Sequence, residues 1–202
     1  THFDATLDSV SRLDLRATAI TISESGRIDV SGRGYLGGSR EGNDSTGQTA
    51  GNQDGSARYA GGSHGGVGAG DSPAPAYGLA SDPQELGGGG GDGSYSYAGG
   101  DGGGRVFITA DQIDLAGQIL AAGIQGSGYR AGGGAGGTIS IVTGDLRGLG
   151  VIRADGGAGE VGGGGGRVLL VYDFSNVPAE NVSANGGAGS HSTGGDGTVE
   201  IP

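Results

Sequence analysis

The sequence predicts an all-β fold: a short right-handed parallel β-helix with three short strands per turn, ordered glycine-rich loops and essentially no α-helix. Two observations lead to this prediction. Short apolar stretches with alternating side chains recur about every thirty residues along the 202-residue chain. Glycine-dense stretches recur in phase with them, and the chain contains 53 glycines. Proline is scarce and the glycines keep no strict three-residue period, which excludes a collagen helix.

Each repeat contains three apolar elements, about six to nine residues apart. The first elements of four successive repeats are Val106–Ile108, Ile139–Ile141, Val168–Leu170 and Val199–Ile201. The second elements are Ile113–Leu115, Leu146 and Val177, and the third elements are Ile119–Ala121, Ile152–Ala154 and Val182–Ala184. An earlier copy of the repeat has Leu13–Leu15, Ile20–Ile22 and Ile28–Val30.

Strands of two or three residues with this alternation bury one face each and cannot stand alone. Stacked in register, they form a continuous core, and each repeat becomes one turn of a parallel β-helix. The handedness rule for parallel crossovers makes this coil right-handed.

The glycine-rich stretches connect the third element of one repeat to the first element of the next. One example is "DGGAGEVGGGGGR" at residues 155–167. Stacked turns lie about 4.8 Å apart, so neighbouring loops must pack backbone against backbone. Glycine tolerates this close approach, so we expect ordered, extended polyglycine-type segments lying side by side. Flexible glycine-rich loops on the same scaffold are the alternative.

One long stretch, residues 32–104, interrupts the repeat. It contains five of the seven tyrosines of the chain. A long insertion on a regular scaffold is a common place for function, although this one could equally cap or flank the stack. We predict a single β-helix segment over residues 1–202, with this Gly/Tyr-rich insertion, that belongs to a longer protein.

Composition excludes several classes of function. The net charge of −11 argues against nucleic acids and anionic membrane surfaces as partners. No apolar run is long enough for membrane insertion. The chain has no cysteine, which excludes a disulfide framework, a thiol nucleophile and a Cys-type zinc site. The three histidines, His2, His64 and His191, lack metal-ligand spacing and are not expected to be catalytic.

Two longer stretches carry a family resemblance. "GGGRVFITADQIDLAGQILAAG" and "GGTISIVTGDLRGLGVIRADGG" resemble the Gly-rich parallel β-helix segments of bacterial secreted and surface proteins. The polyglycine tracts are also similar to those of phage tail-tip adhesins. This resemblance implies an adhesin-like or scaffold role and an extracellular or cell-surface location.

Enzymes of the β-helix class act on polysaccharides, so their chemistry is the alternative to binding. Asp114, Asp145 and Asp173 follow strands, with Arg147 and Arg153 nearby, and carboxylates in a cleft could act as an acid/base pair. They fall at different points of the repeat, so we expect ordinary outward-facing polar residues and assign no catalytic residue. We expect no cofactor; calcium stays an open alternative, with candidate ligands Asp71, Asp92, Asp101, Asp155 and Asp196.

Binding is the function that the sequence favours. Tyr77, Tyr95 and Tyr97, beside Asp92 and Asp101, would form a surface that contacts a glycan or a surface receptor. The alternative is that these rings pack the glycine-rich lobe. We therefore expect a non-enzymatic adhesion module, with a polysaccharide-acting lyase or hydrolase second and a structural spacer third. Self-association or flanking domains would cover the ends of the stack.

Overall fold

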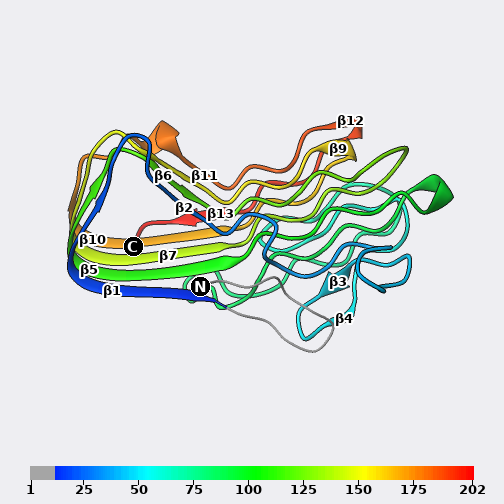
Figure 1. The fold of residues 1–202 in the computed structure, drawn as a ribbon, viewed down its shortest axis with the longest axis horizontal. Coiled ribbons are helices and arrows are strands. Elements are labelled where there is room, and N and C mark those ends of the chain that lie inside the picture. The colour runs from blue at the N-terminus through cyan, green and yellow to red at the C-terminus, as the bar shows by residue number, and fades with distance from the viewer. Residues whose placement is uncertain (1–11) are drawn as a thin grey trace.

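The long strands of successive repeats lie side by side in a computed structural model, which describes residues 12–202 (Figure 1). The prediction of an all-β chain with almost no helix is confirmed for these residues. Two single-turn 3₁₀ segments are present, η1 (Ser94–Ser96) and η2 (Ala179–Asn181). The strands are β1 (Leu13–Ile22), β2 (Arg27–Asp29), β3 (Gln48–Thr49), β4 (Gln53–Asp54), β5 (Arg105–Leu115), β6 (Gln118–Leu120), β7 (Thr138–Arg147), β8 (Val151–Arg153), β9 (Gly159–Val161), β10 (Arg167–Ser175), β11 (Val182–Ser183), β12 (Gly189–Ser192) and β13 (Thr198–Glu200).

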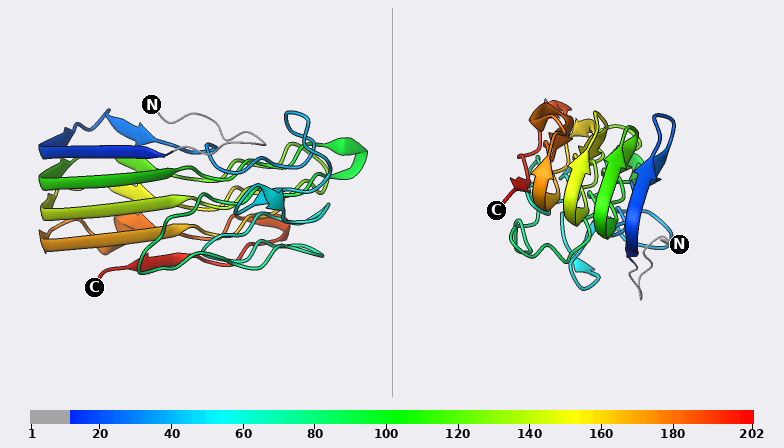
Figure 2. Two further views of the ribbon diagram at one scale, coloured as in Figure 1. Left: turned by 90° about the horizontal axis from the view of Figure 1, so that it is seen from below. Right: turned by 90° about the vertical axis from the view of Figure 1, so that its left-hand side faces the viewer.

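Most of the pairing between strands is parallel. A five-stranded sheet has the order β1-β5-β7-β10-β13, and a four-stranded sheet has the order β11-β8-β6-β2. In the glycine-rich part, β9 and β12 form a parallel pair, and β3 and β4 form an antiparallel hairpin. Figure 2 shows the long strands as one stack at one end of the molecule. No helix in the described part of the chain is long and apolar enough to cross a membrane.

The sheet register follows the predicted repeat. Val106, Ile139 and Val168 are direct neighbours across β5, β7 and β10, and Val199 continues the row in β13. The shorter sheet aligns the third elements in the same way. The apolar spacing in the sequence therefore sets the register, because a one-residue slip would turn every buried side chain outward.

The prediction of three short strands per repeat is wrong in one respect. The first and second elements belong to one strand of ten or eleven residues in β1, β5 and β7, and β10 likewise runs on past its first element to Ser175. Only one rung of the ladder is missing where the two elements meet, at Thr18, Asp111, Gly144 and Asp173. The backbone hydrogen bonds thus continue past a position that the apolar pattern marks as a break.

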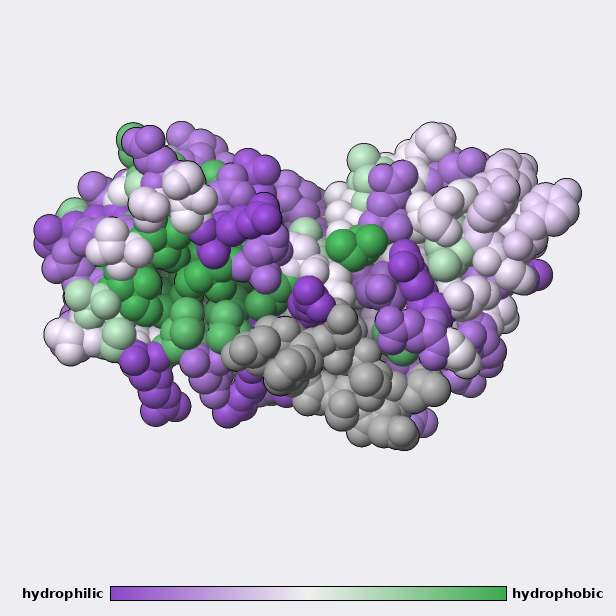
Figure 3. All heavy atoms as spheres, in the orientation of Figure 1, coloured by the Kyte–Doolittle hydropathy of each residue, from purple (hydrophilic) through white to green (hydrophobic). Residues whose placement is uncertain are grey.

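The apolar core fills the strand-rich half, and its ends differ from its middle. Ile139 and Ile113 are fully buried. Leu13, Ile20 and Ile28, which lead the same rows at the β1 end, are only partly buried. On the face shown in Figure 3, apolar residues gather over this half and are framed by hydrophilic residues. Among the described residues, none covers the stack at its β1 end.

The other half is built from extended segments that run side by side (Figure 2, left); they are rich in glycine and are joined by backbone hydrogen bonds. In the tract 87–91, the first and fourth amides donate to the segment 100–103, and the second and fifth donate to the segment 60–63. The third amide donates to Gln48. Amides three residues apart thus bond to the same neighbour, as expected for a helix with three residues per turn and no internal hydrogen bonds.

At many of these glycines the neighbouring backbone leaves no space for a side chain. A methyl group on Gly100 would overlap the carbonyl oxygen of Ile124 on the neighbouring segment. Segments from the insertion 32–104 also bond to tracts of later repeats, since Ala135 donates to Gly88 at 2.8 Å. The insertion is therefore packed among the connections of the regular repeats.

Candidate functional site

Two of the five predicted binding residues lie together on the surface. Tyr95 and Tyr97 belong to η1 and its C-terminal cap, at the end of the glycine-rich half that is remote from the long strands (the green turn at the right of Figure 1). Their side chains are 90% and 44% exposed. The rings meet edge to face, with centroids 6.4 Å apart.

Tyr77 lies in a different environment. Its hydroxyl donates to the carbonyl of Leu86 at 2.7 Å, and its ring lies 5.1 Å from the ring of His64. It packs with Tyr35 in a small apolar cluster, and burial raises the pKa of its hydroxyl well above the usual value. Its contacts are those of a residue that packs the glycine-rich half, and the structure does not bring it to the exposed pair.

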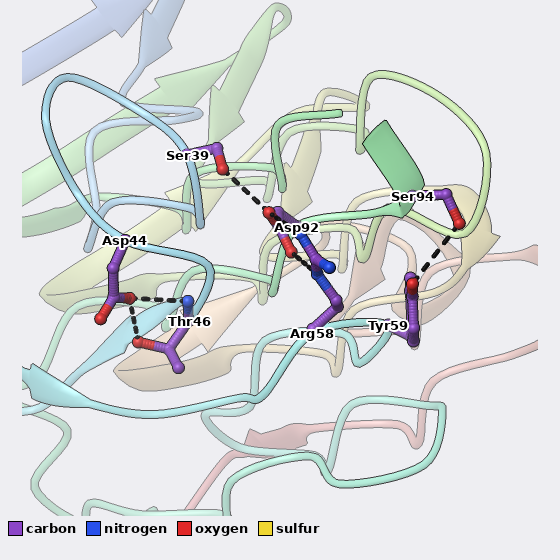
Figure 4. A network of polar contacts seen from close by, with 7 residues as sticks. All are labelled: Ser39, Asp44, Thr46, Arg58, Tyr59, Asp92 and Ser94. Atoms are coloured by element: carbon purple, nitrogen blue, oxygen red, sulfur yellow. Dashed lines mark hydrogen bonds and ion pairs between the residues drawn. The ribbon is translucent and has the colours of Figure 1, made fainter. Parts of the chain in front are cut away.

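The two predicted acidic residues hold backbone segments and loops in place. Asp92 is buried and accepts hydrogen bonds from Arg58 Nε at 2.7 Å, Arg58 Nη2 at 3.0 Å and Ser39 Oγ at 2.9 Å (Figure 4). The pairing raises the pKa of the Arg58 guanidinium. Asp101 accepts the amide of Gly37 at 2.8 Å. Both carboxylates are therefore engaged with the scaffold, by Arg58 and Ser39 at Asp92 and by the Gly37 amide at Asp101.

Sequence reasoning did not include two further tyrosines that the fold brings to the same end. Tyr129 is 57% exposed, and its carbonyl accepts the amide of Ser94, the first residue of η1. The ring of Tyr59 lies 4.6 Å from the guanidinium of Arg130 and 5.6 Å from that of Arg58. We call Arg58, Tyr59, Tyr95, Tyr97, Tyr129 and Arg130 the tyrosine tip.

A sequence signal for these residues exists. Tyr59 and Tyr97 each start the string "YAGG", and Tyr129 starts "YRAGGG". In each case the tyrosine stands immediately before a glycine segment, where the chain has turned back into the packed half. The recurrence of this string identifies the turns that share one end of the molecule.

Backbone strain is concentrated at the tyrosine tip. Tyr59, Tyr95, Ser96 and Arg130 all have a positive φ, between 56° and 67°. Three further non-glycine residues in the described chain share this property, Ser39, Glu41 and Asn52. A left-handed backbone at bulky residues is costly and persists where surrounding contacts hold it, often at sites of function. The tip presents its rings from such turns.

The aspartates considered for catalysis do not form a pair. In the ladder, Asp114 neighbours Thr21 and Arg147, and Asp145 neighbours Gln112. Asp173 sits at the missing rung between the two elements. The expectation that they occupy different points of the repeat is confirmed, and the arrangement lacks the two facing carboxylates of a glycosidase.

The acidic side chains of the described residues do not cluster in the way that metal ligands would. The described part of the chain contains no group of three or more His, Cys, Asp or Glu side chains close enough to hold an ion. Asp71 pairs with Arg130 at 3.1 Å, Asp155 accepts the amide of Asn185, and Asp196 accepts the amide of Gly186. His2 lies outside the described residues.

The chain matches no protein-family model, and comparisons with curated proteins and with solved structures likewise give no match.

Proposed function

We propose that this chain is a non-enzymatic extracellular or cell-surface module that binds a glycan through the tyrosine tip. Its scaffold would be a short right-handed parallel β-helix whose ordered glycine-rich loops carry the tip away from the strands. The in-register rows of β5, β7 and β10 and the hydrogen-bonded glycine segments support this scaffold. The adhesin role follows the resemblance of the repeats to bacterial surface proteins.

The observation that carries the proposal is the exposure of Tyr95 and Tyr97 on a rigid base. Tyrosine offers a flat apolar face and a polar edge at little cost in side-chain entropy, which suits stacking against sugar rings. The pair is anchored because the amide of Gly93 donates to the carbonyl of Tyr97 at 2.7 Å. The two rings are adjacent and together form a small exposed aromatic patch, and contiguous patches of this kind are where proteins bind ligands.

A glycan array tests this function. The wild-type chain should bind a subset of glycans, and a Tyr95→Ala/Tyr97→Ala variant should lose most of that binding. Phe174→Ala is the matched control, because Phe174 is an exposed aromatic residue on β10, outside the tip. Absence of binding by the wild type, or full retention by the double variant, would refute the proposal.

A polysaccharide-acting enzyme is the second candidate, favoured by one groove. It has a volume of about 230 Å³ and lies on the outer face of β1, β5 and β7, with Arg12, Asp14 and Arg16 in its lining. Asp14 is paired with Arg12 at 3.0 Å, so the described lining offers no free acid/base pair. Release of reducing ends from acidic polysaccharides, lost in Asp14→Asn, would establish this activity in place of simple binding.

A further inference from the structure

A groove opens beside the tyrosine tip. Its volume is about 560 Å³, within the range of small-molecule sites. One wall comes from the segment 125–129, and the other comes from β9 and β12. The lining residues are Gln125, Gly126, Ser127, Gly128, Tyr129, Gly159, Glu160 and Ser190.

The groove and the exposed tyrosine pair form one continuous surface. Gly128 lies directly under the ring of Tyr97, since a Cβ at Gly128 would be 2.6 Å from Cγ of that ring. Ser127 donates both its amide and its hydroxyl to the carbonyl of Ala98, each at 2.9 Å. A ligand that stacks on Tyr95 and Tyr97 would therefore extend directly into the groove.

The lining of the groove combines one aromatic face with uncharged polar groups. Tyr129 is more than half exposed, and Gln125, Ser127 and Ser190 supply amide and hydroxyl groups. Hydroxyl-rich ligands are recognised by this mixture, because the ring covers the apolar face of a sugar while the polar groups bond to its hydroxyls.

Of the described residues that line the groove, only Glu160 carries a charge. Its Oε2 accepts the amide of Arg130 at 3.1 Å, which fixes the carboxylate at the rim. The guanidinium of Arg130 is turned to other partners: Nη2 bonds to Asp71 at 3.1 Å, and the group stacks on Tyr59. The carboxylate of Glu160 thus faces the groove without a guanidinium beside it in the lining.

We propose that this groove is a saccharide subsite for an uncharged or amino-bearing sugar, and that Glu160 excludes acidic sugars. The proposal rests on the glycan-binding function assigned to the tip and names its ligand class. A neighbouring sugar of the same chain stacks on Tyr95 and Tyr97. A carboxylate or sulfate on the bound sugar would face Glu160 in a chain whose net charge is already −11.

The experiment uses an array that holds neutral glycans and the same cores capped with an acidic sugar. Glu160→Gln keeps an oxygen that can accept the Arg130 amide but removes the negative charge. The ratio of acidic-glycan binding to neutral-glycan binding should therefore rise on the order of fivefold. Glu180→Gln is the control, because Glu180 is an exposed carboxylate on η2, outside the groove. Ser190→Trp, which fills the groove, and Tyr129→Ala should each weaken neutral-glycan binding at least fivefold; near-ultraviolet circular dichroism checks their folding.

The outcomes separate the two proposals. Binding lost in the Tyr95/Tyr97 variant but retained in both Ser190→Trp and Tyr129→Ala supports the tip and overturns the subsite. Unchanged discrimination in Glu160→Gln overturns the selectivity role. No glycan binding by the wild type overturns both, as would binding of a glycine-rich peptide to the groove in place of saccharides.

Discussion

Protonation of His64 should destabilise the fold as the pH falls. The ring is completely buried, and its Nδ1 lies 2.9 Å from the carbonyl oxygen of Gly136. Nε2 has no hydrogen-bond partner among the residues that the structure describes. Burial, aided by the charge of Arg167, lowers the pKa of His64 from 6.5 to about 4. The neutral ring therefore fits the folded chain and the charged ring does not.

The size of the effect follows from the two pKa values. Above pH 6.5 the ring is neutral in both states, so its contribution to stability is fully present. Between pH 6.5 and about 4 the unfolded chain binds a proton that the folded chain does not, so stability is lost as the pH falls. The loss is about 2 kcal/mol between pH 7 and pH 5 and about 3 kcal/mol below pH 4. A loss of about 2 kcal/mol lowers the Tm by about 4–8 °C in a chain of this size.

Thermal unfolding at pH 7 and pH 5 measures this loss. The wild type should show the full decrease, and His64→Gln should show a smaller one, whatever its stability at pH 7, because the titrating ring is gone. His191→Gln is the control, since His191 is exposed on β12 and should leave the decrease unchanged. An identical decrease in the wild type and His64→Gln would refute the reasoning.

Three further changes test the scaffold. Asp92→Ala removes a buried carboxylate and its charge-assisted hydrogen bonds, so the free energy of unfolding measured in urea should fall by about 2 kcal/mol. Asp44→Asn is the control, because Asp44 is exposed, and it should lower the free energy of unfolding by less than about 0.5 kcal/mol. In Gly100→Ala the new methyl group would overlap a neighbouring carbonyl, so the free energy of unfolding should fall by about 1–3 kcal/mol. In Gly159→Ala the methyl group would make only ordinary contacts, so the free energy of unfolding should not fall in this way. Equal losses in the two variants would contradict backbone-to-backbone packing. Ile20→Glu places a charge on the β1 end of the stack, where Ile20 is only partly buried, so any self-association measured by sedimentation should disappear. Self-association that persists in this variant would show that another surface is responsible.

The apolar spacing is enough to predict the rows of the core. Val106, Ile139 and Val168 are buried neighbours, as their period predicts. The apolar spacing does not predict strand length in the same way. At Asp111 one ladder pair is missing and the alternation of buried side chains shifts, yet the strand continues. A local apolar pattern cannot distinguish a bend within a strand from a gap between two strands.

The sequence is a poorer guide to which residues make up the candidate site. Tyr77 and Tyr95 both stand among glycine and small residues, yet one packs against His64 and the other is 90% exposed. Tyr129 comes close to Tyr97, which stands 32 positions earlier in the chain, because the neighbouring Gly128 lies against the ring of Tyr97. Such meetings depend on which glycine segments become neighbours, and glycine carries no side chain that would specify a partner.

The amino-acid sequence by itself determined the all-β character and the alignment of the repeats, because alternation and spacing are local properties that each segment carries alone. Only the tertiary structure decided which tyrosines gather at one end, that Asp92 is buried against Arg58, and that a groove opens beside Glu160. The physical reason is that backbone hydrogen bonds between glycine segments are nearly identical for every pair of partners, so the arrangement is selected by the packing of the whole half.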